Sequence, residues 1–190
     1  ADKGSPTIAV GDPFSLALRA RRQAMTIFLR WLFLGFALLH VGVHASELSD
    51  RLRAGDHVLL IRHAHAPGVG DPAGFSLERC ETQRLLDRTG QRQAARIGQW
   101  LRAQGVERAA VHASPWCRCR QTAELLGVGP VSIEPTLGSF FAQPQRGEAQ
   151  NLALQDFIAR SLRTSQGQPL VLVTHHVNIR EFTGRDIGTG

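Results

Sequence analysis

Short apolar runs that alternate with amphipathic segments constrain the fold of this 190-residue chain more than any other feature. Three strong runs are HVLLI at 57–61, AAVHA at 109–113 and LVLVT at 170–174, and a shorter one lies at 131–134. Continuous apolar runs of this length are typical of strands buried on both faces of a parallel sheet. Strands that alternate with helices predict an α/β domain in which a mostly parallel sheet lies between two helical layers.

Helical spacing of apolar residues separates these runs. One helix is expected to begin at Ser114-Pro115, since proline is tolerated in the first turn, and to end before Gly127. The remaining helices are expected at 46–56, 90–104, 147–164 and from the end of LVLVT to about residue 182. Residues 66–89 form a long connection rich in glycine, and a loop of that length inside a compact domain is usually functional.

The first 45 residues are expected to lie outside the folded domain, which is predicted at 46–190. Residues 25–45 begin with the only methionine, continue as an apolar run and end in a small-x-small pattern, the layout of a secretory signal peptide. We expect residues 1–24, which precede that methionine, to have no stable fold. The domain would then be periplasmic or otherwise exported, with no stable membrane span after cleavage. The alternative is an uncleaved membrane anchor, although the apolar run at 31–43 is shorter than the roughly 20 residues of a membrane span.

Charge and cysteine content narrow the possible partners and compartments. The formal net charge is +6, but no basic cluster is interleaved with aromatic residues, so nucleic acid is not an expected partner. The cysteines, Cys80, Cys117 and Cys119, are odd in number. In an oxidising compartment Cys80 could pair with Cys117 or with Cys119, and three buried thiols are the alternative. The sequence does not indicate the oligomeric state.

Polar side chains follow each of the three strong strands. Arg62-His63 follows the first strand, Arg118 lies just inside the helix after the second, and His175-His176 follows the third. In an open α/β sheet the carboxyl ends of the strands face one crevice, so these side chains are expected to converge. Arginine forks bind phosphate oxygens, a helix N-terminus adds backbone donors, and an imidazole can attack phosphorus. The residues therefore predict phosphoryl transfer through a phosphohistidine.

Four segments, in order along the chain, resemble the histidine phosphatase (phosphoglycerate mutase-like) superfamily. LLIRHAHAP resembles its RHG signature, with Ala64 where glycine is usual, and GQRQAARIGQWL resembles its first long helix. ASPWCRCRQTAELL is similar to its SPxxRxxQTA segment, which puts the second arginine at Arg118. VLVTHHVNIREFTG is similar to the segment with its second catalytic histidine, which falls on His175. The resemblance covers residues 55–184 and implies a phosphoglycerate mutase-like, three-layer α/β/α fold.

The resemblance implies a metal-independent phosphoric monoester hydrolase that needs no cofactor. His63 would be the nucleophile that becomes phosphorylated. Arg62, Arg118 and His175 would hold the phosphoryl oxygens and stabilise the charge of the transition state. The CETQR stretch at 80–84 and SPWCRCRQTA look most like the periplasmic branch, which includes lipopolysaccharide-core heptose phosphate phosphatases. The expected substrate is therefore a small-molecule or glycan-linked phosphomonoester, such as a sugar phosphate.

Two features depart from the family pattern. Ser139 occupies the place where many members carry an acidic proton donor, which leaves Glu81 and Glu148 as candidates for the general acid. No apolar strand follows the segment that ends at Gly190, so the final edge strand of the family is expected to be missing and one sheet edge to be exposed.

Several side chains near the expected site have two readings. Arg84 and Arg79, both in the long loop, could contact an anionic substrate or belong to the solvated surface. His65 could line the entrance of the pocket or support His63 from behind. His176 is expected to support His175.

Three other functions are alternatives to the phosphatase. His63-Ala64-His65 has the H-x-H pattern of metal-dependent hydrolases, but those barrels usually need about 250 residues or more and a carboxylate ligand close by. A non-catalytic domain that binds phosphate or a sugar phosphate is the second alternative. A cytosolic mutase is the third. The signal segment argues against it, and so does the lack of a glutamate at the place that Ser139 occupies.

Overall fold

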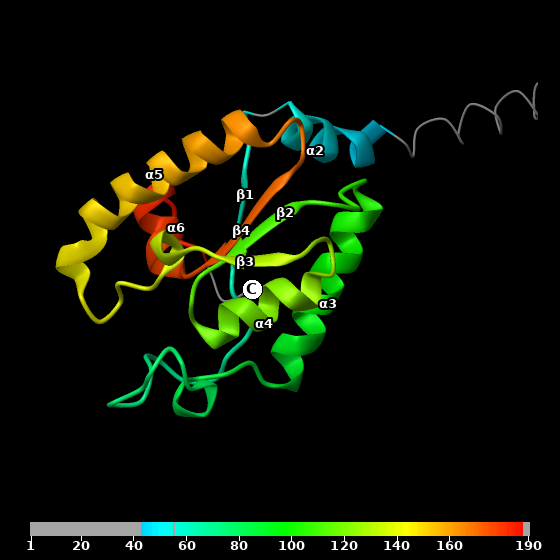
Figure 1. Cartoon of the computed structure of the whole chain (residues 1–190). Helices are drawn as coiled ribbons and strands as arrows, with labels where there is room; N and C mark the ends of the chain where they lie inside the picture. Colours follow the sequence, from blue (N-terminus) through cyan, green and yellow to red (C-terminus); the bar gives the residue numbers. More distant parts are fainter. Residues whose placement is uncertain (1–42, 55, 188–190) are drawn as a thin grey trace, which may run out of the picture. The chain divides into compact units, whose positions relative to one another are not determined.

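The computed structural model describes residues 43–54 and 56–187. The expected extension at 1–24 and nearly all of the expected signal segment at 25–45 lie outside these residues. Four strands form one sheet in the order β1-β4-β2-β3, and every neighbouring pair is parallel (Figure 1). Their bounds are β1 Leu59–Arg62, β2 Ala110–Ala113, β3 Val131–Ile133 and β4 Leu170–Thr174.

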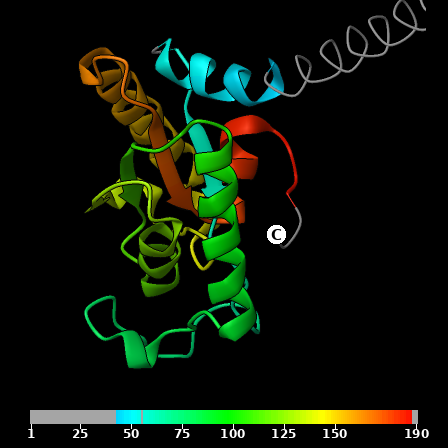
Figure 2. The same ribbon diagram turned by 90° about the vertical axis from the view of Figure 1, so that its right-hand side faces the viewer.

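Helices cover both faces of this sheet, so the predicted three-layer α/β/α architecture is confirmed (Figure 1 and Figure 2). One layer consists of α2 Val43–Arg53, α3 Arg88–Ala103 and α4 Cys117–Leu126, and the other of α5 Gly147–Thr164 and α6 His176–Thr183. Successive residues of a strand point to opposite faces. Accordingly, Val171 and Val173 of β4 pack in the core under the first layer, and Leu170 and Leu172 pack in the core under the second. None of the helices at 43–54 and 56–187 has the length and apolarity of a membrane span.

The strand ladder brings the carboxyl ends of three strands to one edge of the sheet. His63 N donates to Thr174 O at 2.9 Å, and Ser114 N donates to Val173 O at 2.9 Å, so both residues continue the hydrogen bonding of the strands that they follow. His175 directly follows β4. The polar residues after β1, β2 and β4 therefore leave the sheet at the same edge, as the sequence predicts.

The position of β1 differs from the prediction. The run at 57–61 predicts a strand buried on both faces, whereas β1 lies at the edge of the sheet and is only half-buried along its length. Its two faces do pack against the two helical layers, through Ile61 on one side and Leu60 on the other. The strand is apolar on both faces because helices cover both, while no further strand in the described part of the chain pairs with its outer edge. Only β4 is buried at every position.

The start of α4 also differs from the prediction. The helix expected from Ser114-Pro115 begins at Cys117. Ser114 still belongs to the strand ladder, and Trp116 is in an extended conformation with φ −62° and ψ 134°. The first turn of α4 consequently starts later in the sequence than predicted, and Arg118 lies in that turn.

Two glycines of α3 permit close packing beside the expected site. A Cβ at Gly90 would lie 2.0 Å from His65 O, and one at Gly98 would lie 2.0 Å from Leu126 O. Both obstacles are backbone atoms, so no side chain fits at either position. The side chain of Asp87 caps the same helix by accepting a hydrogen bond from Gly90 N at 2.7 Å. α3 is thereby held directly against the backbone that follows β1.

The long connection between β1 and α3 is tied to the start of α4. This connection contains one short 3-10 turn, η2 Cys80–Thr82. Cys80 forms a disulfide with Cys117, which decides between the two pairings that the sequence leaves open, and Cys119 is a free, buried thiol. The side-chain oxygen of Gln83 accepts a hydrogen bond from Cys117 N at 2.9 Å. Covalent and polar contacts therefore fix the loop beside the turn that carries Arg118.

Candidate active site

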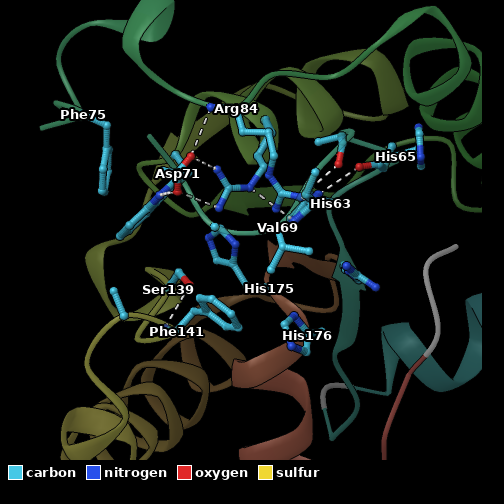
Figure 3. A pocket seen from close by; sticks show the side chains of 18 residues that line it. His63, His65, Val69, Asp71, Phe75, Arg84, Ser139, Phe141, His175 and His176 are labelled. Atoms are coloured by element: carbon cyan, nitrogen blue, oxygen red, sulfur yellow. Dashed lines mark hydrogen bonds and ion pairs between the residues drawn. The ribbon is translucent and has the colours of Figure 1, made fainter. Parts of the chain in front are cut away.

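A cavity of about 580 Å³ lies at the carboxyl edge of the sheet (Figure 3). Arg62, His63, Arg118 and His175 all line it. The other lining residues include Trp116 and come mainly from the long loop after β1 and from the segment 139–142. The structure thus brings together the four residues that the strand ends predicted, although they come from three separate parts of the sequence.

His63 presents an unprotonated ring nitrogen beside an arginine. Its Nδ1 lies 2.8 Å from Ala64 O. Because a carbonyl oxygen only accepts hydrogen bonds, Nδ1 carries the proton and Nε2 has a lone pair. Arg118 Nε donates to this Nε2 at 3.3 Å. The side chain is buried, so an imidazole nitrogen with nucleophilic character and a guanidinium donor meet in a site that excludes most solvent.

The electrostatic environment keeps His63 neutral. Burial is the largest cause and, together with the positive charges of Arg118, Arg62 and Arg84, it lowers the pKa of His63 to about 3. The hydrogen bond to Ala64 O acts in the opposite direction and is outweighed. The imidazole is therefore uncharged at neutral pH, which is the form that can act as a nucleophile.

Three guanidinium groups line the cavity, those of Arg62, Arg84 and Arg118. The buried Nε atoms of Arg62 and Arg84 have no hydrogen-bond partner within residues 43–54 and 56–187. Buried donors are normally satisfied, so these two are available to an anionic ligand. Burial, followed by the charge of Arg118, lowers the pKa of both Arg62 and Arg84. Such a concentration of like charge is unfavourable by itself and favours the binding of an anion.

His175 is buried at the end of β4, next to the proposed nucleophile. Its ring centroid lies 5.4 Å from that of His63. Its Nε2 lies 2.9 Å from Ser114 Oγ and 3.4 Å from Cys119 Sγ. Burial, and then the charge of Arg118, lowers the pKa of His175 well below its usual value. Ser114 was not among the predicted site residues, although its place at the end of β2 was a signal that could have identified it.

Asp71 is a second site residue that sequence reasoning missed. Its Oδ1 accepts from Arg118 Nη1 at 2.7 Å, and its Oδ2 from Arg118 Nη2 at 3.2 Å. Trp116 Nε1 donates to Oδ2 at 2.9 Å, and Arg84 N donates to Oδ1 at 3.1 Å. Among the residues that the structure describes, Asp71 is the one carboxylate that lines the cavity. An aspartate before proline in a glycine-rich loop has the composition of an ordinary turn, so the sequence carried no signal for this role.

His65 lies at the rim of the cavity rather than against the buried ring of His63 (Figure 3). Its side chain is 43% exposed, and its Nδ1 lies 3.2 Å from Asp87 Oδ2. One histidine of the H-x-H pattern is therefore buried and the other is solvated. In the part of the chain that the structure describes, no group of three or more His, Cys, Asp and Glu side chains is arranged to hold a metal ion.

The remaining predicted side chains divide between the cavity and the surface. Glu81 and Glu148, the two candidates for the unassigned general acid, are exposed and do not line the cavity, and the same is true of Arg79. Ser139 does line it, and its Oγ accepts a hydrogen bond from Phe141 N at 3.2 Å. At this position, where the family pattern has an acidic proton donor, the cavity is lined by a serine hydroxyl.

Arg84 and His176, by contrast, do line the cavity. Arg84 Nη1 donates to Ala66 O at 2.9 Å and also to Gly68 O. One end of this guanidinium group therefore holds the loop, while the unpartnered Nε is left for a ligand. The ring of His176 lies against Phe141, with centroids 6.0 Å apart.

We expect the stability of the protein to fall as the pH is lowered from 7 towards 4. The pKa of His63 is about 3 in the folded state and near 6.5 in the unfolded chain, so in that window the unfolded state binds a proton that the folded state excludes. His63 alone then lowers the free energy of unfolding by about 2 kcal/mol at pH 5. Urea unfolding between pH 7.5 and pH 5 measures this, and His63→Gln should reduce the slope. An unchanged slope in that variant would contradict the assignment.

Part of the chain matches a known protein family. Residues 58–142 match the profile of the histidine phosphatase superfamily (branch 1). Among curated proteins no matching sequence was found.

Several solved structures are similar to the chain. A protein described as the phosphohistidine phosphatase SixA from Agrobacterium tumefaciens is 19% identical, over 68% of this chain and 78% of that one, with a TM-score of 0.47. A second protein described as the phosphohistidine phosphatase SixA, from Nakamurella multipartitia, is 25% identical. The match covers 65% of this chain and 62% of that one, with a TM-score of 0.45. A phosphoserine phosphatase from Entamoeba histolytica is 14% identical, over 65% and 76%, with a TM-score of 0.47.

The match with the family includes most of the site. Arg62, His63 and Arg118 fall within residues 58–142, and so do Asp71 and Arg84. The parallel sheet with helices on both faces is the α/β architecture that the resemblance implied. Residues 58–142 of this chain are therefore similar to the histidine phosphatase superfamily, branch 1.

Proposed function

We propose that the protein hydrolyses a phosphomonoester through a phosphohistidine intermediate on His63. One observation carries the proposal: His63 Nε2 accepts a hydrogen bond from Arg118 Nε at 3.3 Å, in a cavity where the buried Nε of Arg62 has no partner among the described residues. A neutral nucleophile next to unsatisfied guanidinium donors is suited to a phosphoryl group. The family match of residues 58–142 supports the same reaction class.

The reaction divides into two displacements at phosphorus. In the first, His63 Nε2 attacks phosphorus, the bond from phosphorus to the leaving oxygen breaks, and the leaving group takes a proton from solvent. The ring becomes cationic, and the hydrogen bond from Nδ1 to Ala64 O stabilises that charge. In the second, water attacks phosphorus, the P–N bond breaks, a proton passes to solvent and inorganic phosphate leaves. Arg62, Arg118 and His175 hold the equatorial oxygens in both steps.

The proposal extends to a sugar phosphate, free or linked to a glycan, as the substrate. The CETQR stretch at 80–84 and the SPWCRCRQTA segment support it through their likeness to the heptose phosphate phosphatase branch. Apolar side chains line the same cavity: Val69 is 87% exposed and Phe141 is 46% exposed. They offer a contact surface for a leaving group larger than phosphate itself.

We also propose that the protein acts outside the cytoplasm. The layout of residues 25–45 supports export, with an N-terminal anchor as the alternative. The Cys80–Cys117 disulfide supports an oxidising compartment as well, since disulfides persist mainly in exported proteins. Labelling of a periplasmic fraction with an antibody to the 46–190 domain would test this localisation.

The function is tested with p-nitrophenyl phosphate, whose good leaving group needs little help from a general acid. In the presence of EDTA, the wild-type protein should turn this substrate over. After a quench in base, ³²P-labelled phosphomonoester should leave protein-bound phosphate that is stable to base and labile to acid. Activity lost in EDTA and restored by zinc would identify a metal hydrolase instead. Phosphate binding without turnover or label would identify a non-catalytic binding domain.

A further inference from the structure

We propose that Asp71 is a positioning residue for phosphoryl transfer, whose carboxylate holds the guanidinium group of Arg118 in the orientation that directs Nε at His63. This inference rests on the proposed function, because it assigns a role within the same reaction. Asp71 does not touch the reacting atoms in this arrangement. It acts through Arg118, which does.

The contacts of Arg118 divide its guanidinium group into two edges. The terminal nitrogens Nη1 and Nη2 donate to the two oxygens of Asp71, at 2.7 and 3.2 Å. Nε donates to His63 Nε2 at 3.3 Å. Since the guanidinium group is planar and its donors form a fixed fork, holding the terminal edge fixes the direction of the other edge. The edge formed by Nε and the second hydrogen of Nη2 is thereby left for a phosphoryl oxygen next to the nucleophile.

Asp71 is itself held rigidly. Trp116 Nε1 donates to Oδ2 at 2.9 Å and Arg84 N donates to Oδ1 at 3.1 Å, so four donors surround one carboxylate. The side chains of Arg118 and Asp71 are 3% and 7% exposed. A buried arginine without its acidic partner is costly and tends to move towards solvent or water. Asp71 therefore keeps Arg118 in the cavity when no phosphate is bound.

The same contacts argue against Asp71 as the general acid that the sequence analysis left unassigned. Burial by itself raises the pKa of Asp71, but the hydrogen bonds and charge of Arg118, with the Arg84 N and Trp116 donors, lower it below its usual value. The carboxylate is therefore ionised at neutral pH and has no proton to give to a leaving group. Both of its oxygens are also occupied by donors.

The test is Asp71→Asn, which preserves shape but removes the charge and one pair of acceptor sites. Asp87→Asn is the matched control, because Asp87 is a carboxylate near the rim that pairs with His65 rather than with Arg118. We expect kcat/KM to fall about 10- to 100-fold in Asp71→Asn, the scale of a catalytic group misplaced by about 1 Å. The fall should be equal for p-nitrophenyl phosphate and for an alkyl phosphate. Asp87→Asn should stay close to wild type.

A double-mutant cycle with Arg118→Lys measures whether the two substitutions lower activity independently. A purely structural role of Asp71 would not make the two losses depend on each other. If Asp71 acts through Arg118, Asp71→Asn should cost little further activity in the Arg118→Lys background, so the two effects should be strongly non-additive. Additive losses would overturn the proposal. Should Asp71→Asn fail to fold, Trp116→Phe removes one donor that holds Asp71. It should give a smaller loss, again equal for the two substrates, and a loss that differs between them would overturn the proposal.

Other results would also overturn the positioning role. A loss confined to the alkyl phosphate, with p-nitrophenyl phosphate spared, would make Asp71 the general acid. Higher activity in Asp71→Asn would make it a competitor of phosphate for Arg118. Unchanged kcat and KM with a lower melting temperature would make it structural. Because all three require an active wild-type enzyme, they are distinguishable from failure of the proposed function, in which the wild type itself shows neither turnover nor label.

Discussion

His63→Ala is expected to abolish the phosphoenzyme and to lower kcat for p-nitrophenyl phosphate by about 10⁴-fold or more, the scale for removal of a covalent nucleophile. Nε2 of His63 accepts a hydrogen bond from Arg118 Nε, and the His63 side chain is buried in the cavity. His175 is the nearest candidate to replace this nucleophile, but its Nε2 is engaged by Ser114 and Cys119. Steady-state kinetics and base-quenched labelling with ³²P-phosphomonoester measure the two effects.

His65→Ala is the control for this experiment, since it removes an imidazole two residues away. His65 is 43% exposed and pairs with Asp87, so it should cost only a small part of the activity and leave the labelling intact. Equal loss in the two variants, or phosphate label that persists in His63→Ala, would show that His63 is not the nucleophile. Thermal melting of both variants checks that each remains folded.

The second large effect is expected at Arg118. Arg118→Ala removes a side chain that donates to both His63 and Asp71, and kcat should fall about 10²- to 10³-fold, as when one donor to a transition-state oxygen is lost. The same change leaves the buried carboxylate of Asp71 without its ion-pair partner, so the protein should also lose about 3–5 kcal/mol of stability. Kinetics below the unfolding temperature separate the two losses.

Arg120→Ala is the matched control, because Arg120 lies on the same helix two residues further on and is exposed. It should change neither kcat nor the inhibition by inorganic phosphate. Product inhibition by phosphate should weaken in Arg118→Ala, since the arginine holds the oxygens that phosphate shares with the substrate. If Arg120→Ala lost as much activity as Arg118→Ala, the second arginine of the site would have been assigned to the wrong residue.

The elements of the fold follow closely from local patterns. The helix at 147–164 and the strand at 170–174 have the predicted bounds, because an amphipathic spacing and a continuous apolar run are properties of neighbouring residues. The edge position of β1 could not be predicted in this way. Its apolar residues face helices on both sides, and the same pattern would suit a central strand equally well.

In the candidate site, too, some positions follow from local sequence and others do not. Arg62, His63 and His175 directly follow predicted strands, and the parallel-sheet rule alone places them at one edge. Asp71 belongs to a loop, and its partner Arg118 is 47 residues away in the sequence. Neither the composition of the loop nor the spacing of the residues encodes that contact, which depends on how the loop folds back over the cavity.

By itself, the sequence determined the α/β class and the edge of the sheet where the polar residues gather, because strand periodicity and the residues at strand ends depend only on local order. The reaction type is a prediction from those same residues. The tertiary structure decided that Cys80 pairs with Cys117, that His65 belongs to the rim, and that Asp71 forms an ion pair with Arg118. The physical reason is that ion pairs, disulfides and burial depend on distances between residues far apart in the chain. Those distances exist only once the loop between β1 and α3 has packed against α4.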